Sequence, residues 1–341
     1  MAHMTIAEAL RQGLREEMVR DERVFCMGED IGVRGGWGGA FTVTLGLEND
    51  FRNRIIDTPI SEGGIFGLAL GAAIMGLRPV ADVQYGDFIF YAMDEVVNQI
   101  AKMRYMSGGK IRVPLVMRAP VGATGRGAQH GQNPEAIFFS VPGIKIACPA
   151  TAYDAKGLLK AAIRDDNPVL LFEHKLLYGS KGARAESGTV DASSDIPSDD
   201  YVVPLGKAIV RREGNDVTII ATLLMMHRAL QAAERLAQEG ISAEVIDARS
   251  LVPFDWDLAN ASVIKTTRAI LVEEGPRQGG WGAEIAATLS DTLSDYLTAP
   301  VQRVASPNIP VPFSPPMENF YRPDADRIAD AARNLLGRGQ Q

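Results

Sequence analysis

The sequence predicts an α/β protein with two domains, each built on a parallel or mostly parallel sheet. Short, continuous apolar runs alternate with helical patterns, which is typical of strands covered on both faces. A length of 341 residues suits about two domains. Periodicity is lost over residues 180–204, where Gly, Ser, Asp and Pro dominate. We therefore predict a first domain at residues 4–185, a linker at 186–204 and a second domain at 205–341.

Helices and strands alternate along the first domain. Residues 5–23 repeat apolar side chains at helical spacing, and Thr5 with Glu8 fits a capping box. A Gly- and Ala-rich apolar helix ends at Gly76, and residues 121–134 form a long Gly-rich loop. The other predicted strands are residues 24–27, 54–57, 78–84, 113–118, 144–148 and 169–173, and the other predicted helices are 41–48, 93–104 and 154–164.

The second domain repeats this alternation in a smaller unit. Residues 306–316 are rich in proline, which fixes φ and lacks a donor, so we expect an extended segment that wraps a surface or meets a partner. The predicted strands are residues 216–221, 242–247 and 269–273, and the predicted helices are 226–239, 282–293 and 324–336.

Composition excludes several classes of protein. The net charge of −7 and the lack of a basic cluster argue against a nucleic-acid partner. Cys26 and Cys148 stand far apart in apolar contexts, so we expect core residues in a reducing compartment. The apolar run 63–77 is too short to span a membrane, and residues 5–25 carry charges unlike a signal peptide. We therefore expect a cytoplasmic protein without a membrane partner.

Glu62 is a carboxylate placed directly before the apolar helix. Ser61 could cap that helix, and an acidic first turn suits the helix dipole. Gly63 and Gly64 weaken this interpretation because glycine destabilises helices, but they let a flat group approach the backbone. From the residues alone, a helix start and a binding site both remain open.

Two further residues are candidates on weaker grounds. Phe88 lies in an aromatic cluster at residues 85–91, which core packing alone would explain. His130 lies in a Gly-rich polar loop after a strand, a place where sites often occur. His174 and His227 match no catalytic pattern, so we interpret both as structural.

Several motifs together resemble one family, the β subunits of thiamine-diphosphate-dependent 2-oxo acid dehydrogenases. This class includes pyruvate, branched-chain 2-oxo acid and acetoin dehydrogenases. The resemblance runs in order from about residue 5 to the C-terminus and implies a transketolase-like pyrimidine-binding domain followed by a transketolase C-terminal domain. The matching motifs are DTPISE at residues 57–62, GLRPV at 76–80, AQHGQ at 128–132, DAKGLL at 154–159, AIRDDNP at 162–168 and SPNIPVPF at 306–313.

The resemblance assigns roles to three side chains. Glu62 would hydrogen-bond N1′ of the aminopyrimidine ring of thiamine diphosphate, and Phe88 would stack on that ring. His130 would point into the active site and assist substrate binding or proton transfer as the acyl group passes to a lipoyl arm. Gly131 stands where many relatives have serine, which leaves the neighbouring hydrogen bond uncertain.

The resemblance also implies a potassium site near the end of the helix at residues 154–164. A helix C-terminus capped by Asp and Asn before Pro168 explains the same residues, so both interpretations stay open. The implied ligands are the carbonyl oxygens of Leu115, Ala162, Ile163 and Asp165, together with Asn167.

One motif of thiamine enzymes is missing from this chain. Gly-Asp-Gly, whose aspartate helps to bind the diphosphate through Mg²⁺, does not occur. The resemblance thus implies that an α subunit binds Mg²⁺ and the diphosphate, in a heterotetramer of two α and two β chains. Such a complex would decarboxylate a small 2-oxo acid and reductively acylate a lipoyl domain of an acyltransferase core.

Three alternative functions remain. Residues 35–39 and 173–179 resemble acetoin-type β chains, which cleave acetoin instead. The C-terminal half of a split transketolase shares the glutamate and the domain order, although AQHGQ and SPNIPVP disfavour it. A non-catalytic scaffold subunit is disfavoured because Glu62, Phe88 and His130 occur together.

Overall fold

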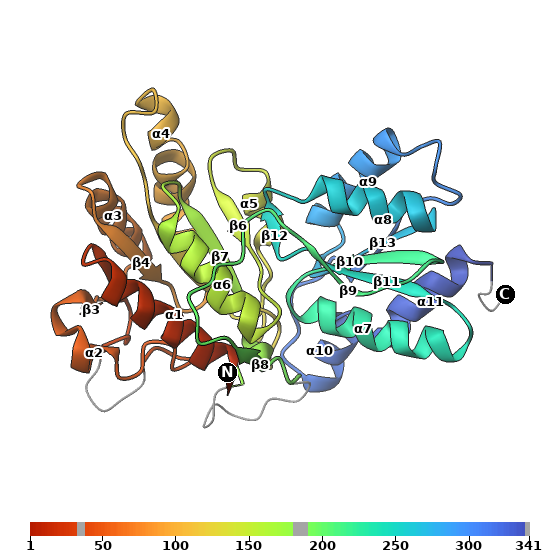
Figure 1. Ribbon diagram of the computed structural model, residues 1–341, viewed down its shortest axis with the longest axis horizontal. Helices are drawn as coiled ribbons and strands as arrows, with labels where there is room; N and C mark the ends of the chain where they lie inside the picture. The colour runs from red at the N-terminus through yellow and green to blue at the C-terminus, as the bar shows by residue number, and fades with distance from the viewer. Residues whose placement is uncertain (33–37, 180–189, 338–341) are drawn as a thin grey trace.

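The computed structural model describes residues 1–32, 38–179 and 190–337. Two α/β units lie side by side along the long axis (Figure 1), and most strands within each sheet run parallel. The predicted fold class is therefore confirmed. Parts of the predicted 35–39 motif, of the linker and of the C-terminus lie outside the described residues. Within the described residues, no helix has both the length and the apolar character that crossing a membrane requires.

The first sheet has seven strands in the order β12-β6-β7-β5-β4-β2-β3. All neighbouring strands pair in parallel except β12 and β6, which are antiparallel. β12 is the edge strand beside β6, and its residues belong to the predicted second domain. The bounds are β2 (Val24–Gly28), β3 (Ile55–Asp57), β4 (Arg78–Asp82), β5 (Val116–Val121), β6 (Lys145–Ala147), β7 (Val169–His174) and β12 (Ser250–Val252).

Helices pack against both faces of this sheet. The predicted capping box forms at Thr5, and α1 (Ile6–Arg20) packs against α6 (Ala152–Arg164). On the other side, α3 (Glu62–Ile74) packs against β4 and the turn η2 (Gly86–Ala92). The shorter elements are α2 (Leu47–Asp50), η1 (Arg52–Arg54), the π-helix η3 (Asp94–Ile100), α4 (Met103–Met106), α5 (Glu135–Phe139) and η4 (Lys175–Leu177).

The second sheet has five strands in the order β14-β13-β10-β11-β9, with only β9 antiparallel to its neighbour. Helices α7 and α11 lie on one side of it, and α8 and α9 lie on the other (Figure 1). The bounds are β9 (Ile209–Arg212), β10 (Val217–Ala221), α7 (Leu223–Gln238), β11 (Ala243–Asp247), α8 (Trp256–Thr266), β13 (Ala269–Pro276), α9 (Trp281–Thr292), β14 (Gln302–Ser306), α10 (Pro315–Tyr321) and α11 (Ala325–Leu335).

Several element predictions were wrong. Residues 41–46 form turns, and the short helix begins only at Leu47. The predicted extended tail ends early because α10 begins at Pro315, and proline is tolerated where a helix needs no donor. Within the predicted linker, β8 (Ser194–Ile196) pairs with β1 (Ala2–Met4), so that stretch is partly ordered against the first domain.

Hydrogen bonds and ion pairs join the two domains. Asp154 on α6 pairs with Arg249 at 3.1 Å and with Arg211. His174 Nε2 lies 2.8 Å from Glu274 Oε2, and His227 Nε2 lies 2.7 Å from the Ala150 carbonyl. Both histidines bind across the domain boundary, which agrees with the structural role we predicted for them.

Candidate active site

Glu62 is the first residue of α3 and is only 8% exposed. Ser61 occupies the N-cap position but makes no capping hydrogen bond with its side chain. Among the described residues, the Glu62 carboxylate has no hydrogen-bond partner. A buried carboxylate without a donor is costly, so the helix-start interpretation leaves this side chain unexplained.

Glu29 is a second buried carboxyl beside Glu62. It follows β2, whose end pairs with the end of β3 in the register Gly28 to Asp57. Its Oε1 is buried and has no partner among the described residues. Burial, and then the negative charge of Glu62, raise the pKa of Glu29 to about 7. We did not predict Glu29, although its position at the carboxyl end of a parallel strand was a usable signal.

Phe88 and His130 lie in contact with each other. Their ring centroids are 5.3 Å apart with an interplanar angle of 87°. Tyr85 packs edge-on against His130 at 5.6 Å. Lys175 donates to the His130 carbonyl, and its ammonium lies 4.8 Å from the Tyr85 ring centroid. Because η2 carries Phe88 and packs on α3, the aromatic cluster neighbours the helix that Glu62 begins.

The loop that carries His130 is fixed from both domains. Asp87 Oδ1 accepts hydrogen bonds from the backbone N and the Nε2 of Gln132, each at 3.0 Å. The Ala123 N–H donates to Glu274 at 2.8 Å. The Gly125 N–H donates to Glu318 of α10 at 2.7 Å. The second domain therefore helps to position a loop of the first, although sequence reasoning identified none of these carboxylates.

The residues present fit an aminopyrimidine ring. Glu62 supplies a buried acceptor, Phe88 is a half-buried aromatic side chain, and Gly63 and Gly64 follow the carboxylate. A Cβ added at Gly63 would lie 3.3 Å from Glu95 Oε1, so the missing side chain at this position accommodates Glu95 of the same chain and is not evidence for the ring. This arrangement can hold a flat heterocycle and exchange a proton with one of its nitrogens.

The predicted potassium ligands lie close together, and each has a protein donor. Arg78 Nη1 donates to the carbonyls of Ile163 and Asp165, at 2.9 and 3.0 Å. The Asn167 side chain accepts from Arg104 at 2.6 Å. The remaining carbonyls, those of Leu115 and Ala162, accept from the backbone N–H groups of Val169 and Asp165. The described residues contain no cluster of acidic, His or Cys side chains suited to a metal ion.

Comparison with known proteins gives two family matches in the same order as the two sheets. Residues 2–181 match the transketolase pyrimidine-binding domain, and residues 206–328 match the transketolase C-terminal domain. Among solved structures, a split-gene transketolase described as an inactive β4 tetramer superposes with a TM-score of 0.78. It shares 24% identity and covers 99% of this chain and all of its own. That likeness supports the fold alone.

Curated relatives are more similar in sequence. The 2-oxoisovalerate dehydrogenase β subunit of Bacillus subtilis is 44% identical, covering 98% of this chain and 99% of its own length. The acetoin:2,6-dichlorophenolindophenol oxidoreductase β subunit of B. subtilis is 43% identical, covering 98% of this chain and 97% of its own length. The pyruvate dehydrogenase E1 β subunit of the same organism is 42% identical, covering 98% of this chain and 99% of its own length. The chain therefore belongs to the transketolase-like family of β subunits of thiamine-diphosphate-dependent 2-oxo acid and acetoin dehydrogenases.

Proposed function

We propose that this chain, with an α subunit, decarboxylates a small 2-oxo acid and reductively acylates a lipoyl domain. The observation that carries the proposal is Glu62, a buried carboxylate beside Glu29 for which the described residues supply no hydrogen-bond donor. Phe88 and His130, in mutual contact, supply the second part of the site. When bound, thiamine diphosphate supplies the carbon nucleophile and the electron sink for such chemistry.

The side chains of this chain bind, orient and exchange protons. Glu62 would hold N1′ of the bound ring through a hydrogen bond and share a proton with it, and its buried position would strengthen that bond. Phe88 holds the ring flat. His130, whose loop is fixed by Asp87 and Glu318, exchanges a proton with the substrate.

An α subunit is the proposed partner because one face of α3 is apolar and open. Leu68 is 66% exposed and Met75 is 82% exposed. A Cβ added at Gly71 would meet no atom of the described residues within 4 Å, so the helix surface there has room for a closely packed partner. We propose a heterotetramer of two α and two β chains, in which the α chain binds Mg²⁺ and the diphosphate, and which docks on a lipoyl-bearing core.

Cleavage of acetoin is the second candidate reaction. This chain is 44% identical to the relative named for 2-oxoisovalerate and 43% identical to the relative named for acetoin. Overall sequence identity therefore does not favour either reaction. The stretch containing Lys175, which resembles acetoin-type chains, lies directly against His130. Turnover of a panel of 2-oxo acids and acetoin by the assembled complex, with an artificial electron acceptor, separates the two reactions.

The proposed mechanism is tested by Glu62→Ala in the assembled α/β complex. We expect 2-oxo acid decarboxylation to fall by about 10²-fold or more because the proton-sharing acceptor is lost. Glu22→Ala, an exposed carboxylate on the chain surface, is the matched control. Unchanged decarboxylation in the Glu62 variant would show that the mechanism is wrong, and turnover of sugar phosphates would favour the split transketolase.

We also propose potassium as a ligand of the carbonyl cluster around Arg78. A carbonyl oxygen has two lone pairs, so it can bind an ion with one of them while it accepts a hydrogen bond with the other. A ligand that binds only the folded protein raises Tm. We therefore expect a higher Tm in KCl than in NaCl of equal ionic strength, and equal values would favour the simple helix cap.

A further inference from the structure

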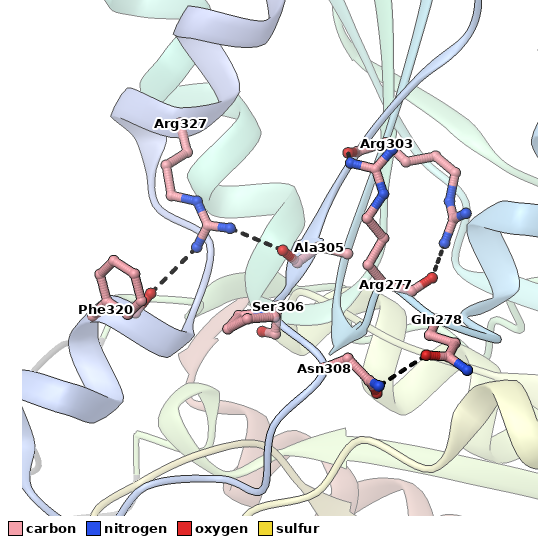
Figure 2. A pocket seen from close by; sticks show the side chains of 9 residues that line it. Arg277, Gln278, Arg303, Ala305, Ser306, Asn308, Phe320 and Arg327 are labelled. Atoms are coloured by element: carbon pink, nitrogen blue, oxygen red, sulfur yellow. Dashed lines mark hydrogen bonds between the residues drawn. The ribbon is translucent and has the colours of Figure 1, made fainter.

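A cleft of about 500 Å³ on the second domain is lined by three arginines from three separate segments of the chain. Arg277 directly follows β13, Arg303 lies in β14 and Arg327 lies in α11. Figure 2 shows Arg327 reaching toward Ala305 from one side, with Arg277 and Arg303 on the other. The other lining residues are Gln278, Ala305, Ser306, Pro307, Asn308 and Phe320.

Backbone carbonyls hold these guanidinium groups in place. Arg277 donates to the Arg303 carbonyl at 3.4 Å, and Arg303 donates to the Arg277 carbonyl in return. Arg327 donates to the Ala305 carbonyl at 2.9 Å and to the Phe320 carbonyl at 3.3 Å. Carbonyl partners fix the position of a cation but leave its charge unneutralised.

Little negative charge faces the three arginines. Arg303 has one carboxylate nearby, Glu273 at 3.7 Å, and burial raises the pKa of that carboxyl to about 7. In the part of the chain that the structure describes, Arg277 and Arg327 form no ion pair with a carboxylate. The Arg303 Nε is buried and has no acceptor among the described residues. Buried donors normally have partners, so the Arg303 side chain retains an unused donor beside this cleft.

We propose that the cleft binds a phosphate-bearing small molecule through Arg277, Arg303 and Arg327. Guanidinium forks match phosphate oxygens, and three cations lining one cleft suit a multiply charged group better than a single carboxylate. Phe320, 75% exposed at the rim, offers a ring face for the rest of the ligand. The volume lies within the range of small-molecule sites. All the residues that line this cleft belong to the second domain, whereas Glu62 and Phe88, which we propose bind thiamine diphosphate, belong to the first.

Calorimetric titration of the full-length chain with inorganic pyrophosphate tests the proposal. We expect saturable binding that acetate at equal ionic strength does not reproduce. Arg277→Met should weaken pyrophosphate binding about tenfold, because it removes a charge-assisted hydrogen bond. The Arg277 side chain is exposed, so we expect this variant to fold. Arg327→Met should act in the same direction. Arg333→Met is the matched control, because Arg333 also lies on α11 but already pairs with Glu239 and Asp330.

Three results would overturn the proposal. The first is that pyrophosphate shows no saturable binding, and the second is that acetate binds as tightly as pyrophosphate. The third such result is that Arg277→Met and Arg333→Met weaken pyrophosphate binding equally. The titration is then repeated with the α/β complex already loaded with thiamine diphosphate, so that the cofactor site cannot contribute. Retained binding supports a small-molecule site, whereas its disappearance on assembly would assign the cleft to a contact between subunits instead.

Discussion

At the scale of single residues, the pKa of Glu29 predicts how stability depends on pH. The folded chain raises this pKa from 4.5 to about 7. The folded state therefore binds the proton more tightly than the unfolded state, and the stability that results is lost as pH rises from about 4.5 to 7. Glu29→Gln cannot titrate. We expect its Tm, relative to the native chain, to be higher at about pH 8 than at about pH 5.

Two variants control this experiment. Glu22→Gln removes an exposed carboxylate, and we expect its Tm difference from the native chain to stay nearly constant across the same pH range. Glu62→Gln removes the charge that adds to the shift, so the loss of stability should move to lower pH. If the Glu29 and Glu22 variants gave parallel curves, Glu29 would not be the titrating group.

Site residues differ in how visible they are in the sequence. Glu62 and His130 stand in recognisable motifs and Phe88 stands in an aromatic cluster, and the predicted roles of all three come from the family resemblance. Lys175 is 45 residues from His130, and no local pattern records that its ammonium contacts the His130 carbonyl. Glu29 is likewise brought to Glu62 only by the pairing of β2 with β3. Contacts made by tertiary folding were therefore invisible in the sequence.

At the scale of elements, the loop after β5 gives a matched pair of glycine variants. Gly122 has φ +100°, and a Cβ there would lie 2.1 Å from His174 Nε2. Gly125 has φ +73°, but a Cβ there would meet no atom of the described residues within 4 Å. Gly125→Ala should cost about 1–2 kcal/mol of unfolding free energy from backbone strain. Gly122→Ala should cost about 1–3 kcal/mol more from the steric clash.

Thermal unfolding of the two variants measures the difference. We expect the lower Tm for Gly122→Ala, because the clash also displaces His174 from Glu274 across the domain boundary. Equal Tm values would mean that His174 moves aside freely, and that its hydrogen bond to Glu274 does not fix the loop.

Elements were predicted well where burial is complete and poorly at sheet edges. Strands such as β7 and β10 are buried along their whole length and give clear apolar runs. The missed strands β9 and β14 are the two edges of the second sheet, and polar or charged residues interrupt both. Edge strands carry such residues because one side faces solvent, so their sequences resemble loops. The missed helix α8 contains several residues of modest helix propensity, including Asn, Val and Thr.

At the scale of the whole molecule, the two domains share one candidate site. The His130 loop belongs to the first domain, yet Glu274 and Glu318 of the second hold its backbone. The proline-rich segment between β14 and α10 also reaches this loop, since a Cβ at Gly131 would lie 2.9 Å from Val311. A change in the second domain can therefore alter the position of His130 without touching the first. Neither domain alone provides the complete site.

The open face of α3 predicts how the chain assembles. Leu68 is 66% exposed on the open face of α3, close in sequence to the exposed Gly67 and Gly71. Leu68→Glu places a charge where we propose that the α subunit packs, and a buried unpaired charge is strongly unfavourable. We expect this variant to fold with an unchanged Tm but to fail to form the heterotetramer with the α chain. Light scattering after size-exclusion chromatography of the co-expressed pair measures the outcome.

Val19→Glu is the matched control, because Val19 is an isolated apolar side chain on α1 that is 73% exposed. The same substitution there adds the same charge to a surface without the open glycines of α3. We expect the Val19 variant to assemble normally, so that loss of assembly in the Leu68 variant reports the position of the charge. If both variants assembled, α3 would not be the contact surface. If both failed to assemble, added charge in general would be the cause.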